Sequence, residues 1–201
     1  MYRKQWMTAL ALLFLLGNIV GCQMNTEEGK GDEQREPGME AVAPTGEEGA
    51  EAPLKVMMQN TKGEEIGEAT LSQVQDGVLI SLEAGHLPPG LHGFHIHEKG
   101  ICEAPTFESA GPHFNPTNKK HGFENPEGPH AGDLPNIEVK EDGTVQVEIV
   151  AKMVTLEADK ENSLLQDEGT SLIIHSEADD YYSQPAGNSG DRIACGVIKG
   201  D

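Results

Sequence analysis

The chain has 201 residues, the length of about one domain with some tail to spare. It carries 14 basic against 34 acidic residues, a net charge of −20, which argues against nucleic acid as a partner because phosphate binding needs clustered lysine and arginine. Its 24 glycines and 12 prolines indicate many turns and argue against a helical bundle.

The N-terminus has the pattern of an export signal. Two basic residues precede an apolar run over residues 7–16, which is too short to span a bilayer and fits the core of a signal peptide. Residues 19–22, IVGC in sequence, resemble the bacterial lipobox, whose cysteine is lipidated and becomes the new N-terminus. We therefore predict a signal peptide over residues 1–21 and lipidation of Cys22. An ordinary signal peptide with a chance cysteine is the alternative.

The next segment, residues 22–53, is predicted to be an acidic disordered tether. Residues 23–53 hold nine acids and two bases and contain no aromatic residue. Such a composition cannot bury enough apolar area to offset the entropy cost of ordering. Lipidation of Cys22 also accounts for the odd number of cysteines. It leaves Cys102 and Cys195 as a pair on the oxidising side of the membrane, where disulfides persist.

Residues 54–201 are predicted to form an all-β domain. Alternating apolar runs separated by turn residues indicate eight strands, at 54–59, 65–74, 77–82, 91–97, 137–140, 145–151, 172–174 and 193–198. This pattern is typical of an eight-stranded Greek-key β-sandwich or barrel. The one weak helical signal covers residues 157–168. Two long loops, 98–135 and 176–191, interrupt the pattern, and loops of this length in a compact domain are usually functional.

The histidines indicate a metal site. All eight lie between residues 86 and 175, and alternation along a strand puts His95 and His97 on one face, where both imidazoles can reach one metal. His92 points to the other face and is expected to be structural. The long loop and a later strand supply the other candidate ligands, which are His113, His121, His130, Asp133 and His175. Imidazole-rich sites suit copper and zinc, and three histidines with one aspartate suit tetrahedral zinc.

Here the sequence resembles the copper/zinc superoxide dismutases, over about residues 54–198. The resemblance rests on ordered blocks: GFHIHE at 93–98, GPHFNP at 111–116, KHG at 120–122, HAGDL at 130–134, His175, ADD at 178–180 and GNSGDRIACG at 187–196. It implies the same fold, one copper and one zinc per chain, and superoxide as the substrate. It further implies a one-electron copper cycle that converts superoxide to O₂ and H₂O₂.

The resemblance also implies a role for each site residue. The implied copper ligands are His95, His97, His113 and His175. The implied zinc ligands are His113, His121, His130 and Asp133, so His113 bridges both metals and takes up a proton when copper is reduced. Asp179 links His95 to His121 from behind the ligands. Arg192 attracts and orients the anion, and Cys102 and Cys195 form the disulfide.

Two other functions remain open at this point. One is a non-enzymatic copper- or zinc-binding lipoprotein on the same scaffold, because a fold alone does not fix an activity. The other is a zinc hydrolase, which needs an open zinc position that the four implied zinc ligands would fill. The favoured interpretation is a dismutase exported from a bacterial cell and anchored to the extracytoplasmic side of its membrane. No lysine or arginine lies between His175 and Arg192, where related enzymes commonly carry lysines, and the oligomeric state is left open.

Overall fold

The computed structural model describes residues 52–200. The predicted signal peptide, the lipidation site at Cys22 and nearly all of the predicted tether lie outside these residues. Within residues 52–200, no helix is long and apolar enough to cross a membrane. The boundary predicted near residue 54 stays a prediction.

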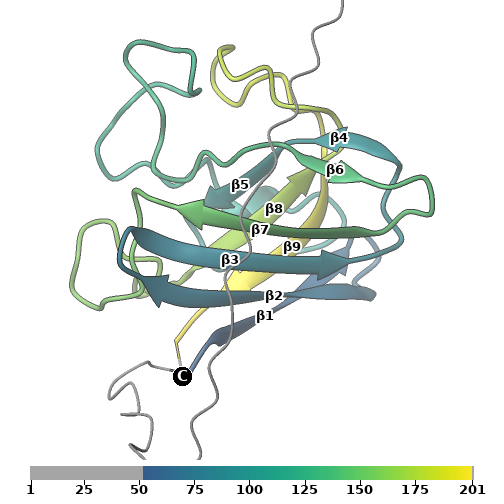
Figure 1. Cartoon of the computed structure of the whole chain (residues 1–201), viewed down its shortest axis with the longest axis horizontal. Coiled ribbons are helices and arrows are strands. Elements are labelled where there is room, and N and C mark those ends of the chain that lie inside the picture. Colours follow the sequence, from purple (N-terminus) through teal and green to yellow (C-terminus); the bar gives the residue numbers. More distant parts are fainter. Residues whose placement is uncertain (1–51, 201) are drawn as a thin grey trace, which may run out of the picture. The chain divides into compact units, whose positions relative to one another are not determined.

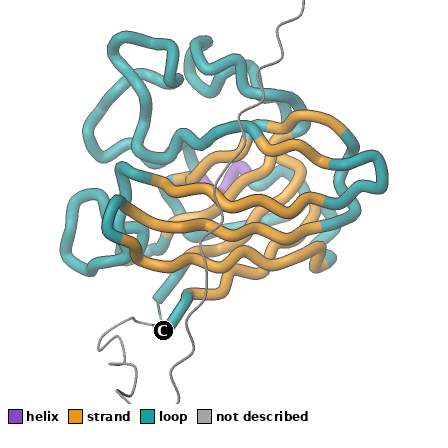
Figure 2. Tube along the Cα trace, in the orientation of Figure 1, coloured by secondary structure: helices purple, strands orange, loops and turns teal. Residues whose placement is uncertain are grey.

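The described part of the chain folds into nine strands and one short 3₁₀ helix (Figure 1). The strands are β1 (Leu54–Asn60), β2 (Glu65–Val74), β3 (Gly77–Ala84), β4 (Gly90–His92), β5 (Phe94–His97), β6 (Ile137–Val139), β7 (Val145–Ala151), β8 (Thr170–His175) and β9 (Arg192–Ile198). The 3₁₀ helix η1 covers Glu108–Ala110. Apart from that helix the described chain is strand and loop, as Figure 2 shows.

The strands form a curled antiparallel sheet closed on one side by a short ribbon. The large sheet has the order β5-β8-β9-β1-β2-β3-β7, and β4 pairs with β6 in a second sheet beside it. The neighbours β5–β8, β9–β1 and β3–β7 are not consecutive in sequence, and they are the crossovers of a Greek-key arrangement. The predicted all-β fold class, a Greek-key sandwich or barrel, is thereby confirmed.

Two details of the prediction were wrong. The strand expected over residues 91–97 is divided at Gly93, because β4 pairs with β6 whereas β5 pairs with β8. The Gly93 amide donates to the Glu177 carbonyl instead of to a strand, and a Cβ atom there would lie 2.9 Å from the side chain of Ser189. The chain therefore changes sheets at a glycine. Residues 157–168 form turns and a bridge and contain no helix.

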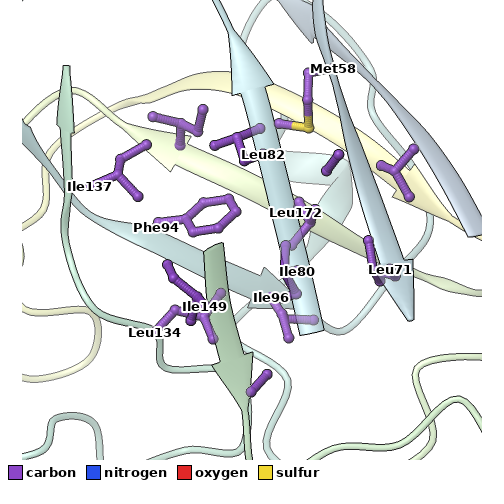
Figure 3. Close-up of a cluster of buried hydrophobic side chains, with 14 of the residues drawn as sticks. Met58, Leu71, Ile80, Leu82, Phe94, Ile96, Leu134, Ile137, Ile149 and Leu172 are labelled. Carbon is purple, nitrogen blue, oxygen red and sulfur yellow. The ribbon is translucent and has the colours of Figure 1, made fainter. Parts of the chain in front are cut away.

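The main core lies on the concave side of the large sheet (Figure 3). Alternate residues of the strands point into it, so Phe94 and Ile96 of β5 are buried here while His95 and His97 face the other way. Side chains that are largely shielded from solvent fill the rest of this core, among them Met58, Leu71, Ile80, Leu82, Leu134, Ile137, Ile149 and Leu172. This packing gives β5 and β8 a fixed base from which their outward-facing histidines project.

Candidate metal centre

The free edge of β5 organises the candidate site. β5 is the outermost strand of the large sheet, so its outer edge is open to pairing with the long 98–136 loop. Two short bridges form there, between His97 and His113 and between His95 and Asp133. The amide of Phe114 donates to the Ile96 carbonyl, and the Ile96 amide donates to the Gly132 carbonyl, each at 2.8 Å. Backbone pairing thus carries the loop residues to the strand histidines.

Two groups of candidate ligands result, and they share His113. The first group is His95, His97, His113 and His175, and the second is His113, His121, His130 and Asp133. Within each group the candidate ligand atoms all lie within 4.8 Å of one another. The ring centroids of His95 and His113 are 4.0 Å apart, and those of His113 and His121 are 5.2 Å apart. The structure therefore brings together all seven residues that the sequence analysis proposed as ligands.

In the first group, each imidazole has one nitrogen engaged and one free. The Nε2–H of His95 donates to Asp179 at 2.8 Å, and the Nδ1–H of His97 donates to the Gly111 carbonyl at 2.8 Å. His175 directs Nδ1 toward the Gly190 carbonyl at 3.4 Å. The buried nitrogens left without a partner are His95 Nδ1, His97 Nε2, His113 Nε2 and His175 Nε2.

Four unpartnered nitrogens buried together require an explanation, because buried polar atoms are normally hydrogen-bonded. Burial lowers the pKa of His113 to about 4 and that of His175 to about 2, and it also lowers the pKa values of His95 and His97. The rings are therefore neutral at physiological pH, the form in which imidazole binds a metal. Four neutral imidazole donors fit copper.

The second group is built around the carboxylate of Asp133. Its Oδ2 accepts hydrogen bonds from the backbone amides of Gly122 at 2.8 Å and His130 at 3.0 Å. That leaves Oδ1 facing Nδ1 of His113, His121 and His130, at 2.8, 3.1 and 3.2 Å. Three imidazole nitrogens around one carboxylate oxygen form the donor set of a tetrahedral zinc site.

The charges of the second group also fit a cation. Burial alone would raise the pKa of Asp133, but its histidine partners hold the pKa well below the usual range of a carboxyl. Burial alone would lower the pKa of His121, but hydrogen bonds to Asp133 and Asp179 raise it to about 9. The two carboxylates thus draw a positive charge between them, and a bound metal ion would supply that charge in place of a proton.

Asp179 connects the two groups. Its Oδ2 accepts from His95 Nε2 at 2.8 Å, and its Oδ1 accepts from His121 Nε2 at 3.0 Å. The backbone of Asp179 is held in turn by Asn136, whose side-chain oxygen accepts from the Asp179 amide at 2.8 Å and whose Nδ2 donates to the Asp179 carbonyl at 2.9 Å. Such contacts fix the orientation of metal-binding rings.

Arg192 lies beside the first group at the start of β9. Its Nη1 donates to the Phe107 carbonyl at 2.6 Å and its Nη2 to the Gly111 carbonyl at 2.7 Å. Since the Gly111 carbonyl also accepts from His97, the guanidinium and a candidate ligand share one anchor. Arg192 lines a cavity of about 610 Å³ together with Glu108 and Asp191.

Cys102 and Cys195 form the predicted disulfide, with their Cα atoms 5.7 Å apart. The bridge ties the beginning of the long loop to β9, three residues from Arg192. His92, which was expected to be structural, is buried at the end of β4, and its ring nitrogens lie 2.7 and 2.8 Å from the carbonyls of His175 and Pro88.

Three residues that hold site side chains in place were not predicted from the sequence. The carbonyls of Phe107 and Gly111 have no sequence signature, because every residue carries a carbonyl. Asn136 lies close to the HAGDL block, but nothing in the sequence pattern linked Asn136 to Asp179, which is 43 residues away. Gly187 is a fourth position of interest: a Cβ atom there would overlap the Asp179 carboxylate, so the glycine in the GNSGDRIACG block allows this close approach.

Known proteins resemble this chain in sequence and in structure. The sequence model of the family described as "Copper/zinc superoxide dismutase (SODC)" matches residues 65–198. The chain belongs to the copper/zinc superoxide dismutase family. Superoxide dismutase [Cu-Zn] 1 of Aquifex aeolicus (strain VF5) is 57% identical over 141 residues, which is 70% of this chain and 83% of that protein.

Two solved structures place the family resemblance in three dimensions. A SOD-like protein from Bacillus subtilis superposes with a TM-score of 0.71 at 46% identity, covering 73% of this chain and 99% of that one. The Cu/Zn superoxide dismutase from Brucella abortus gives a TM-score of 0.61 at 31% identity, covering 74% and 100%. The dismutase fold therefore spans nearly the whole described part of the chain.

Proposed function

We propose that this chain converts superoxide to O₂ and H₂O₂ at a copper/zinc centre. One observation carries the proposal: four buried imidazole nitrogens converge without partners. The guanidinium of Arg192 lies beside them, because the Gly111 carbonyl accepts from both Arg192 and His97. The names of its relatives support copper and zinc as the cofactors and superoxide as the substrate.

In this proposal the first histidine group holds copper and the second group, with Asp133, holds zinc. When bound, copper supplies the one-electron redox chemistry, and zinc, which has none, supplies positive charge. Asp179 holds His95 and His121 in the orientation that ligation needs, and the Gly111 carbonyl does the same for His97. The protein's part is thus to keep the donor atoms fixed and to keep the four imidazoles of the first group neutral.

Arg192 is proposed to attract and orient the anion. It is the only arginine in residues 54–201, and no lysine accompanies it between residues 176 and 191. Its planar fork donates from two nitrogens to backbone carbonyls, which fixes the direction of the charge. Because low-dielectric walls focus a local field, this charge can act despite the net negative charge of the domain.

His113 is proposed to hold and release a proton at Nε2. That nitrogen is buried and unpartnered, whereas Nδ1 faces Asp133 at 2.8 Å. With Nδ1 committed to the zinc side, Nε2 is the ring nitrogen left to take up a proton and pass it to the peroxide product. Asp133 holds the ring in place during this exchange.

A dismutation assay on the full-length chain tests the proposed function. Protein stripped of metal is supplied with zinc, and copper is then titrated in while the rate of superoxide decay is followed. We expect activity to appear with copper and to level off at about one copper per chain, because one complete group of four imidazoles is present. Copper that binds without producing activity would favour the non-enzymatic metal-binding lipoprotein. One relative, which is 47% identical to this chain and is named only superoxide dismutase-like, supports that alternative.

The disulfide is typical of proteins outside the reducing cytoplasm. We propose in addition that the mature chain is anchored to the bacterial membrane through Cys22, on the strength of the IVGC sequence at residues 19–22. Cys22→Ser is expected to leave the protein unprocessed or to release it from the membrane fraction, since diacylation provides the two chains that stable anchoring requires. Fractionation with immunoblotting checks this. Normal processing and membrane association of the variant would contradict lipidation.

A further inference from the structure

Arg192 is aimed by one loop of the protein. Its two terminal nitrogens donate to the carbonyls of Phe107 and Gly111, at 2.6 and 2.7 Å, and the side chain is only partly exposed. Both acceptors belong to the segment around η1, which lies between β5 and His113 in sequence. The direction of the guanidinium therefore depends on how firmly this segment is held against the sheet.

The backbone of Phe107 has an unusual conformation. Its φ of 55° and ψ of 20° lie in the left-handed region, which a residue with a side chain adopts only when its surroundings compensate. In this conformation the Phe107 carbonyl accepts hydrogen bonds from Arg192 and from the Ala110 amide, the latter at 3.1 Å. The Phe107 amide donates to the backbone carbonyl of Glu103 at 3.0 Å. The conformation is what turns the carbonyl toward Arg192.

The ring of Phe107 supplies that compensation. It is fully buried in a small apolar cluster on the outer side of the sheet, separate from the main core. Its partners in this cluster are Ala110, Ile173, Cys195 and the partly buried Cys102. Ile173 pairs directly with His95 on one side and with Cys195 on the other. The ring thus anchors the loop to the strands that carry the site.

We infer that Phe107 is a positioning residue, whose buried ring holds the carbonyl that aims the Arg192 guanidinium at the incoming anion. This inference rests on the proposed function, in which Arg192 orients superoxide. The disulfide alone does not explain the geometry, because the acceptor carbonyl belongs to Phe107, five residues beyond Cys102. The disulfide holds the loop near the sheet, and the large buried apolar side chain of Phe107 sets the orientation of its carbonyl.

The mobility of Arg192 can be measured without metal. Phenylglyoxal modifies arginine, and peptide mapping by mass spectrometry separates Arg192 from Arg35, which stays in the chain after the predicted signal peptide is removed and serves as the internal reference. In the metal-free protein, Phe107→Ala is expected to raise the modification rate of Arg192 about tenfold relative to Arg35, because a hydrogen bond to the charged group is weakened. The copper-loaded variant is expected to lose affinity for azide, a small anion, in parallel.

Matched variants separate positioning from general loss of stability. Phe107→Leu keeps a large apolar side chain and should keep the wild-type modification rate of Arg192. Phe107→Gly adopts the left-handed conformation without strain but lacks the ring, so it should behave like Ala. Leu82→Ala, in the main core, should lower stability without changing the modification rate.

Three results would overturn the inference: a wild-type modification rate in Phe107→Ala, a wild-type rate in Phe107→Gly, or an increase of the same size in Leu82→Ala. Failure of the proposed function gives a different result. A wild-type chain that shows no copper-dependent dismutation would refute the enzyme, whereas the ratio of modification rates in the metal-free protein would still report whether Phe107 holds Arg192.

Discussion

Replacing His175 with alanine is expected to abolish dismutation while zinc remains bound. His175 belongs to the first ligand group alone, and its Nε2 is one of the four buried nitrogens without a partner. Removing the His175 side chain leaves the second group complete, because His175 is not a member of that group. Metal content by mass spectrometry and the rate of superoxide decay, both measured on full-length protein, check this result.

Asp133→Ala is the matched variant on the zinc side. The change removes the carboxylate that faces Nδ1 of His113, His121 and His130, so zinc is expected to be lost and the loop to loosen. Some copper-dependent activity should remain, because all four nitrogens of the first group are still present. Equal loss of both metals in both variants would contradict the division of the site into two groups.

Cys102→Ser is expected to cause the largest loss of stability. The disulfide joins residues that are 93 apart in sequence, and closing a loop of that length contributes about 4–5 kcal/mol in the chain-entropy model. Chemical denaturation of the variant and the wild type under oxidising conditions measures the difference. Reduced wild-type protein is the matched control and should fall to the stability of the variant. Two free thiols at residues 102 and 195 in unreduced, denatured wild type would contradict the bridge.

The strands were largely predictable because their information is local. Alternating apolar residues in β5 placed Phe94 and Ile96 on one face and His95 and His97 on the other, and the structure has this arrangement. The break at Gly93 was not predictable in the same way. It depends on which partner each half of the segment finds, and those partners, β6 and β8, lie far along the chain.

The candidate ligands could be named from the sequence because histidine and aspartate carry their chemistry in the side chain. The geometry that holds them is mostly backbone. β5 edge pairing brings His113 and Asp133 to the strand, and carbonyls of Phe107 and Gly111 direct Arg192. Backbone groups are identical at every residue, so only a three-dimensional arrangement reveals which of them take part.

The most direct test of the copper assignment is anomalous X-ray diffraction from crystals of the metal-loaded protein, with data on both sides of the copper and zinc absorption edges. The result expected is copper among His95 Nδ1, His97 Nε2, His113 Nε2 and His175 Nε2. A separate zinc ion is expected against Nδ1 of His113, His121 and His130 and the Oδ1 of Asp133. A copper signal elsewhere, or none at the four unpartnered nitrogens after copper loading, would contradict the account.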